Sequence, residues 1–162
     1  LTTSELKAIV DPASGSPAHQ LSSVSIQSST VSNNIATHGG GIFAASDEPL
    51  VRFTLNNSIV ADNTALSRDP DLLGTFEADF NLIGDPGTAS VTEGVAGSNL
   101  FGVDPLLGPL QDNGGPTLTH ALQAGSPAID AADAGACPAT DQRGVARPQG
   151  AGCDVGSFEL VP

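Results

Sequence analysis

A repeated strand-and-turn pattern constrains the fold of this chain more than any other feature of its sequence. The segment from Val24 to Asn34 (VSIQSSTVSNN) aligns with Phe53 to Asn63 (FTLNNSIVADN) after a shift of 29 residues. Apolar residues then fall on apolar residues, and turn residues fall on turn residues. A shorter third copy, Phe80 to Asp85 (FNLIGD), follows at a shift of 23 residues. Repeats of this length stack on one another, because a single copy cannot bury its apolar face alone.

Within each copy, apolar and polar residues alternate over a few positions before Asn, Asp or Gly. This alternation indicates a short, half-buried strand followed by a turn. Several short strands in a period of 23 to 29 residues, with no helical pattern, predict an all-β chain folded as a parallel β-helix, a solenoid of stacked coils. Equivalent residues of such coils form columns, so we expect Ser29 to stack with Ser58, and Asn34 with Asn63.

The sequence divides into three regions. Residues 1–23 are predicted to be an N-terminal segment or cover, residues 24–86 the β-helix coils, and residues 87–162 a loop-rich C-terminal layer. In the last region the periodicity fades, and turn signals such as DNGGP and GSP separate scattered apolar residues. The open ends of a solenoid carry unpaired backbone N–H and C=O groups, so we expect the layer to pack on the last coil.

The charge of the chain argues against two classes of partner. The chain has 18 acidic residues against 5 Lys and Arg, which gives a formal net charge of −13. Nucleic acid and anionic membrane surfaces are therefore not expected as partners. The sequence also predicts no membrane span, because it contains no apolar run of the length that a transmembrane helix needs.

Both cysteines lie in the segment CPATDQRGVARPQGAGCDVG, which runs from Cys137 to Gly156. A disulfide between Cys137 and Cys153 is one interpretation, and closing a loop of about 15 residues stabilises a chain by roughly 3 kcal/mol. Metal thiolates are the other interpretation, but they favour a CxxC pair or a histidine at ligand spacing, and His120 is the nearest histidine. We favour the disulfide, which also fits an oxidising compartment.

The charged residues around the cysteines predict a structural clasp. Arg143 offers five donors in a rigid fork that suits carboxylates and backbone carbonyls. We expect Arg143 to form a network with Asp141 and Asp154, which Asp130 joins. The clasp would fasten the C-terminal layer, and its members are Cys137, Cys153, Asp141, Arg143, Asp154 and Asp130.

A carboxylate pair supplies the alternative, catalytic interpretation. Asp62 and Asp85 occupy equivalent positions in adjacent copies, and glycoside hydrolases use two carboxylates about 5 to 9.5 Å apart. The same column, which begins at Asn33, also has a structural interpretation, because Asn and Asp tolerate the left-handed conformation of turns. We favour the turn column and assign no catalytic residue. No histidine of the sequence lies in a recognisable catalytic or metal-binding motif.

Calcium is the cofactor that the acidic residues suggest. Acidic residues gather in two segments, but neither follows the DxDxDG pattern of a calcium loop, and acidic surface clusters are usually solvated. The favoured interpretation has no metal and no cofactor. The less favoured calcium ligands are Asp69, Asp71 and Asp133.

Four motifs resemble a known group of proteins: NSIVADN, FNLIGD, DPLLGPLQDNGGPTLTHALQAGSPAIDAAD and DQRGVARPQGAGCDVGSFE. They resemble the C-terminal part of secreted bacterial right-handed parallel β-helix proteins, the choice-of-anchor Q domain group with a pectate-lyase-like fold. The resemblance covers roughly Leu50 to Glu159. It implies an extracellular or cell-surface location and a chain that is part of a larger solenoid, and it implies no reaction.

The expected function is architectural, that of an extracellular structural or adhesive module in a surface or matrix fibre. We expect such a module to associate with itself or with other surface proteins through the β-helix ends. The alternative is a polysaccharide-binding or polysaccharide-cleaving fragment, a lyase or hydrolase. Carbohydrate grooves usually offer stacking aromatic residues, and this chain has 6 phenylalanines and no tryptophan or tyrosine. The sequence therefore favours a structural protein over an enzyme.

Overall fold

The computed structural model describes residues 22–45 and 51–162, and this part of the chain is all-β. The all-β prediction is therefore confirmed, and the predicted N-terminal segment lies outside the described residues except for its last two. The strands are β1 (Ser22–Gln27), β2 (Thr30–Ser32), β3 (Ile35–His38), β4 (Ile42–Phe43), β5 (Val51–Asn56), β6 (Ile59–Ala61), β7 (Thr64–Arg68), β8 (Leu72–Leu73), β9 (Thr75–Asp79), β10 (Leu82–Ile83), β11 (Ser90–Thr92), β12 (Leu100–Phe101), β13 (Leu107–Gln111) and β14 (Thr119–Leu122). A 3-10 turn, η1 (Ala134–Ala136), follows β14.

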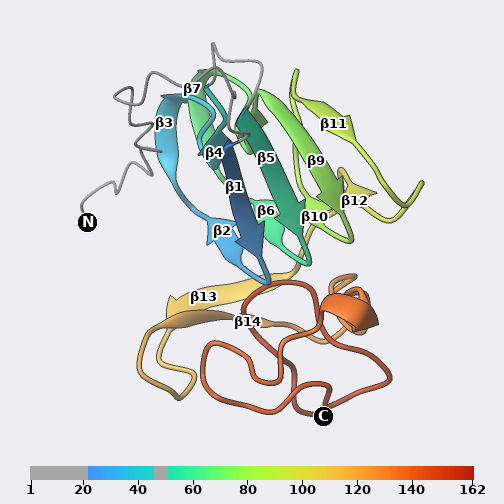
Figure 1. Ribbon diagram of the computed structural model, residues 1–162. Helices are drawn as coiled ribbons and strands as arrows, with labels where there is room; N and C mark the ends of the chain where they lie inside the picture. The colour runs from blue at the N-terminus through green and yellow to red at the C-terminus, as the bar shows by residue number, and fades with distance from the viewer. Residues whose placement is uncertain (1–21, 46–50) are drawn as a thin grey trace, which may run out of the picture.

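Two four-stranded parallel sheets form the centre of the molecule (Figure 1). Sheet A has the order β1-β5-β9-β11, and sheet B has the order β2-β6-β10-β12. Two shorter parallel pairs, β3 with β7 and β4 with β8, repeat the same arrangement. The chain thus returns to each sheet several times, and we call each return a pass.

The strand pairing has the register that the repeat predicts. Val24 pairs with Phe53, and Leu82 of the third copy pairs with Ile59. The parallel pairing continues past residue 86, where we expected the coils to end, because β11 pairs with β9 and β12 pairs with β10. The expected boundary is corrected to the end of β12. Strands of two and three residues are too short to show alternation in the sequence.

The two faces of sheet B are both buried, unlike those of sheet A. Strand β6 carries three consecutive buried apolar residues, Ile59, Val60 and Ala61. Val60 belongs to the core that also contains Leu55 and Phe76 of sheet A. Ile59 and Ala61 belong to a second core, shared with the C-terminal residues. Consecutive apolar residues are typical of strands that are covered on both faces.

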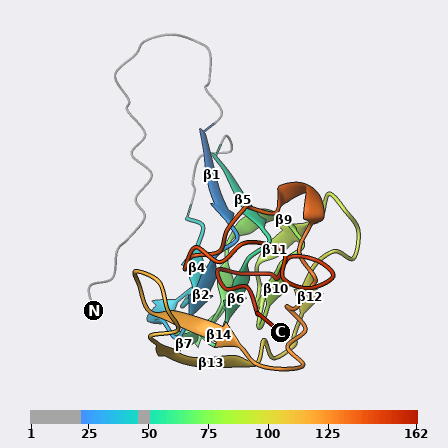
Figure 2. The same ribbon diagram turned by 90° about the horizontal axis from the view of Figure 1, so that it is seen from below.

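The C-terminal layer, from β13 onward, covers the outer face of sheet B. Figures 1 and 2 show β13 and β14 beside the strands of sheet B, with the rest of the layer next to them. Val155 and Phe158 pack with Ile59 in the second core, and Ser157 N–H donates to Thr30 Oγ1 of β2 over 3.1 Å. The layer therefore covers sheet B from the last pass, where Leu100 packs against the same core, to the first strand, which the prediction of packing on the last coil did not include. The physical reason is that the apolar outer face of sheet B must be buried.

Side-chain ladders connect successive passes, as predicted. Ser29 N–H donates to Ser58 Oγ over 3.2 Å, and Asn34 Nδ2 donates to Asn63 Oδ1 over 2.9 Å. The predicted stacking of Ser29 with Ser58 and of Asn34 with Asn63 is confirmed. These ladders satisfy backbone groups in the turns, where no regular sheet pairing is available.

Each ladder ends at a carboxylate. Ser58 N–H donates to Asn81 Oδ1 over 2.9 Å, and Asn81 N–H donates to Asn99 Oδ1 over 3.0 Å. Asn99 then donates from its N–H and its Nδ2 to Glu93 Oε1 over 3.1 and 2.8 Å. In the other ladder, Asn63 Nδ2 donates to Asp71 Oδ1 over 2.8 Å. An ionised carboxylate can accept hydrogen bonds but cannot donate them, so it terminates a chain of amide donors.

Candidate functional site

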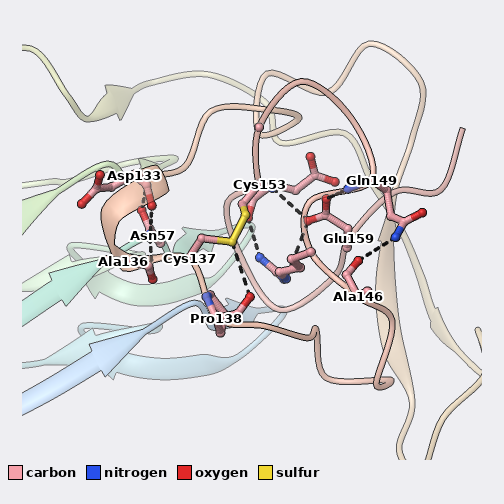
Figure 3. The surroundings of a disulfide bond; sticks show 12 residues. Asn57, Asp133, Ala136, Cys137, Pro138, Ala146, Gln149, Cys153 and Glu159 are labelled. Atoms are coloured by element: carbon pink, nitrogen blue, oxygen red, sulfur yellow. Dashed lines mark hydrogen bonds and ion pairs between the residues drawn. A yellow bond between two sulfur atoms is a disulfide. The ribbon is translucent and has the colours of Figure 1, made fainter.

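A disulfide joins Cys137 to Cys153 in the C-terminal layer (Figure 3), and the two Cα atoms are 6.2 Å apart. The predicted disulfide is confirmed. Cys137 follows η1, and the residue before η1, Asp133, accepts from Gly135 N–H over 2.9 Å. Asp133 N–H in turn donates to Asn57 Oδ1 over 2.8 Å. The disulfide therefore links the end of the layer to a segment that is already bound to the turn between β5 and β6.

Replacing both cysteines by serine is expected to lower the free energy of unfolding by about 3 kcal/mol, because the unfolded chain gains the freedom that a loop of this size removes. Urea denaturation with and without a thiol reductant measures the effect. The reductant should destabilise the wild-type chain and leave the double serine variant unchanged. Equal unfolding midpoints for wild type and variant would contradict the prediction.

Arg143 makes the predicted contact with Asp141. Its Nη2 lies 2.7 Å from Asp141 Oδ2, and its Cζ lies 3.5 Å from the centroid of the Phe158 ring. Cations over an aromatic face are attracted by its quadrupole. Asp141 also accepts from the N–H groups of Arg143, Val145 and Glu159. Burial raises the pKa of Asp141, but the hydrogen bonds from Glu159 N–H and from Arg143 outweigh it and hold this pKa below its ordinary value.

Asp154 is bound by the backbone and not by Arg143, which corrects the predicted network. Its two carboxylate oxygens accept from Asp130 N–H over 2.8 Å and from Leu160 N–H over 2.6 Å. Burial raises the pKa of Asp154. The reason for the difference is that the turn at Gly144 directs Arg143 back to Asp141 and Phe158. Asp130 does belong to the clasp, as predicted, and its Oδ1 accepts from Gly152 N–H over 2.8 Å.

Arg147 and Glu159 form the buried centre of the clasp, and neither is among the clasp residues predicted from the sequence. Each side chain is 1% exposed, and Arg147 Nε lies 3.6 Å from Glu159 Oε2. Arg147 also donates to the carbonyls of Asp154 and Gly156 over 2.7 and 2.8 Å. Glu159 accepts from Gln149 N–H over 2.7 Å (Figure 3). Burial lowers the pKa of Arg147, and the charge of Glu159 opposes that shift.

Two clefts flank β2, one at each end of the strand. The first has a volume of about 430 Å³ and the second a volume of about 520 Å³. In both, one wall is the first pass, and the other includes the C-terminal layer. The first cleft is lined by Ser28, Ser29, Thr30, Pro138, Thr140, Asp141, Gln142, Arg147 and Ser157, and the second by Ser32, Asn33, Asn34, Asp62, Leu107, Gly108, Pro109, Leu110 and His120.

The second cleft brings Asp62 together with His120. Burial raises the pKa of Asp62, and the charges of Asp104 and Asp71 raise it further, while His120 lowers it. His120 Nδ1 lies 2.7 Å from the carbonyl oxygen of Gly108, so Nδ1 carries the proton in neutral imidazole and Nε2 is the acceptor. The sequence did not indicate this pairing, because β13 and β14 bring His120 to the turn after β6.

Asp85, the other half of the alternative carboxylate pair, belongs to a different group. Its N–H donates to Asp71 Oδ2 over 2.6 Å, and its Oδ1 accepts from Gly87 N–H over 2.9 Å. It is not among the charges that shift the pKa of Asp62. The turn interpretation describes the column better, because Asn33 and Asp62 both have φ of 60°.

Replacing Asp62 by Asn is expected to raise the thermal unfolding temperature at pH 7 and to leave it unchanged at pH 3. A carboxyl group whose pKa is raised by folding binds more protons in the folded state, so its contribution to stability falls as pH rises from its unfolded pKa through its folded pKa. Asn does not ionise, so the variant avoids this loss of stability at pH 7. Asn also adopts the left-handed backbone conformation of this position readily. Calorimetry at both pH values tests the sign, and a lower unfolding temperature at pH 7 would contradict it.

The three calcium candidates do not come together. Asp69 and Asp71 are buried and accept from backbone amides, including Thr88 N–H and Asn63 N–H. The bond from Thr88 N–H lowers the pKa of Asp69. Asp133 caps η1 in the C-terminal layer. Across residues 22–45 and 51–162, no group of three or more His, Cys, Asp or Glu residues is placed to hold a metal ion.

Comparisons with known proteins give no match: no family model, no curated protein and no solved structure matches the chain. In the described part of the chain, no helix is long and apolar enough to cross a membrane. The disulfide is compatible with an extracellular location, because disulfides persist in oxidising compartments.

Proposed function

We propose that the chain is the C-terminal part of an extracellular right-handed parallel β-helix protein of the choice-of-anchor Q group, with an architectural role. The observation that carries this proposal is the parallel stacking of successive passes. The ladder residues that join them are separated by 29, 23 and 18 residues. In a solenoid each repeat contacts only its neighbours, and equivalent residues lie in columns.

The clasp supports an architectural role over a catalytic one. The carboxylates of Asp141, Asp154 and Glu159 all accept from backbone N–H groups, and two arginines lie among them. Groups that are engaged in this way stabilise the chain and are not poised to transfer protons. A buried network of hydrogen bonds and ion pairs makes a structure rigid, which is what a surface scaffold requires.

Two experiments test this proposal. Immunoblots of the source organism's culture medium, cell surface and cell interior should find the chain outside the cell with its disulfide formed. A reduced chain confined to the interior would contradict the location. A crystal structure should show right-handed crossovers between the strands of sheets A and B, and left-handed crossovers would contradict the fold.

Polysaccharide binding or cleavage is the second candidate, and the second cleft favours it. There, Asp62 with its raised pKa lines the cleft together with His120 and with the apolar residues Leu107, Pro109 and Leu110. A carboxyl group and an imidazole are the usual acid–base groups of enzymes. The test is incubation with a panel of neutral and uronic acid polysaccharides, followed by assays of reducing ends and of unsaturated products. An activity that is lost in Asp62→Asn and kept in Asp85→Asn would establish this candidate, whereas inactivity and no binding support the architectural role.

A further inference from the structure

The two side-chain ladders have a direction. In each step, the N–H of a residue in one pass donates to the side chain of the residue below it in the next pass, as Ser29 does to Ser58 and Asn34 does to Asn63. The side chain of the lower residue is fixed by a hydrogen bond to its own chain, two residues earlier. Ser58 Oγ donates to Asn56 O over 2.9 Å in this way. Each ladder residue thus presents an acceptor toward the pass that precedes it.

The first pass presents the same acceptors with nothing above them in the described residues. Ser29 Oγ donates to Gln27 O over 2.7 Å, which is the arrangement that Ser58 has. Asn34 Nδ2 donates to Ser32 O over 3.2 Å, as Asn63 Nδ2 does to Ala61 O over 3.1 Å. No N–H group of residues 22–45 or 51–162 donates to Ser29 Oγ or Asn34 Oδ1. Both acceptors therefore face the edge of β1 and β2 with which no other described strand pairs.

The C-terminal layer extends the binding surface beyond that edge. Ser29 lines the first cleft and Asn34 lines the second, and the layer forms the opposite wall of each. Thr30, between them, is held to the layer by Ser157 Oγ over 3.1 Å. A strand added next to β2 would therefore pair with β2 on one side and contact the layer on its outer face.

We propose that this edge binds one further β-coil, a parallel strand-turn-strand segment whose backbone N–H groups donate to Ser29 Oγ and Asn34 Oδ1. The recognition is β-strand addition, in which the backbone supplies affinity and the two side chains set the register. The inference rests on the proposed solenoid, and it adds the location and the register of the next coil.

A second copy of this chain is a poorer occupant than another coil. If copies stacked end to end, Asn99 N–H of one copy would have to reach Ser29 Oγ of the next. That N–H already donates to Glu93 Oε1 over 3.1 Å, and the hydrogen bonds from Gly97 N–H and from the side chain and N–H of Asn99 lower the pKa of Glu93. The last strands, β11 with 3 residues and β12 with 2, are each shorter than the strands at the opposite edge of the same sheet, β1 with 6 and β2 with 3, and short edge strands resist pairing with other chains. The C-terminal end of the stack is therefore closed, whereas the N-terminal edge is unpaired within residues 22–45 and 51–162.

The test is the binding of a synthetic coil to the full chain. The probe is a fluorescein-labelled peptide with the sequence of residues 51–73, in which the Ser58 and Asn63 positions supply the two N–H groups. Fluorescence anisotropy measures its affinity. The same peptide with N-methyl groups at those two positions should bind at least about tenfold more weakly to the wild-type chain, because two hydrogen bonds are lost.

Protein variants and hydrogen exchange locate the site. The double variant Ser29→Ala, Asn34→Ala should also weaken binding about tenfold, while Ser25→Ala, on the exposed face of β1, should not. Thermal unfolding of each variant checks that it folds. Bound peptide should slow amide exchange in β1 and β2 and leave β11 and β12 unchanged.

Three results would overturn the inference: no binding by the wild-type chain, equal binding of both peptides, or protection at β11 and β12. Filaments of the wild-type chain in sedimentation velocity would contradict the choice of occupant. None of these outcomes depends on the crossover handedness or the cellular location, which test the proposed function separately.

Discussion

Replacing Arg147 by Ala is expected to lower the free energy of unfolding by about 3 to 5 kcal/mol, because removal of one partner leaves a charge buried without compensation. Glu159, whose side chain is 1% exposed, would lose its partner, and the carbonyls of Asp154 and Gly156 would lose their donor. Equilibrium urea denaturation measures the change. This buried pair is the part of the clasp on which the layer depends most.

The matched control for this variant is Arg52→Ala. Arg52 Nη1 lies 3.0 Å from Glu77 Oε1, but the two side chains are 59% and 48% exposed. Exposed pairs contribute about 0 to 1 kcal/mol. Adding Glu159→Gln to Arg147→Ala should recover part of the lost stability, since the uncompensated charge is then gone. Equal losses for the two single arginine variants would contradict the buried pair as the centre of the clasp.

Ile59→Ala is expected to cost about 2 to 5 kcal/mol, because it opens a cavity between sheet B and the C-terminal layer. Ile59 is 0% exposed and packs with Val155 and Phe158 of the layer. Thermal or urea unfolding measures the loss, and faster hydrogen exchange in residues 155–160 should accompany it. The second readout shows that the layer itself has loosened.

Ile35→Ala is the control with the same chemical change, since Ile35 of β3 is 67% exposed. Exposed substitutions of this kind usually change stability by less than about 0.5 kcal/mol. If both isoleucine variants unfolded at the same denaturant concentration, the lateral packing of the layer on sheet B would be wrong.

The register of the sheets could be predicted from the sequence because a stacked fold converts a period into contacts. Once Val24 is aligned with Phe53, every other pairing between β1 and β5 follows, and so does the stacking of Ser29 on Ser58 in the turns after these strands. The end of the pairing could not be predicted, since the last pass is short and its strands carry too few residues to show a pattern. The disulfide could be inferred because the chain has 2 cysteines and no motif of metal ligands.

The position of the C-terminal layer was not predicted, although the sequence carries a signal for it. The residues Ile59, Val60 and Ala61 form a continuous apolar run. Such a run is typical of a strand that is covered on both faces. The placement of Asp62 and His120 in one cleft had no signal of its own in the sequence. It depends on how the β13–β14 hairpin lies against the turn after β6, and a sequence argument has no rule for that placement.

The contact between Ser157 and Thr30 joins residues that are 127 positions apart. Contacts of such separation form late, because the entropy of closing the intervening chain must be overcome first. When the chain emerges from a ribosome or a secretion channel with its N-terminus first, the outer face of sheet B stays exposed until the final residues arrive. Newly emerged sheets therefore carry an unprotected apolar surface, and this is the stage at which chaperone binding or aggregation should be greatest.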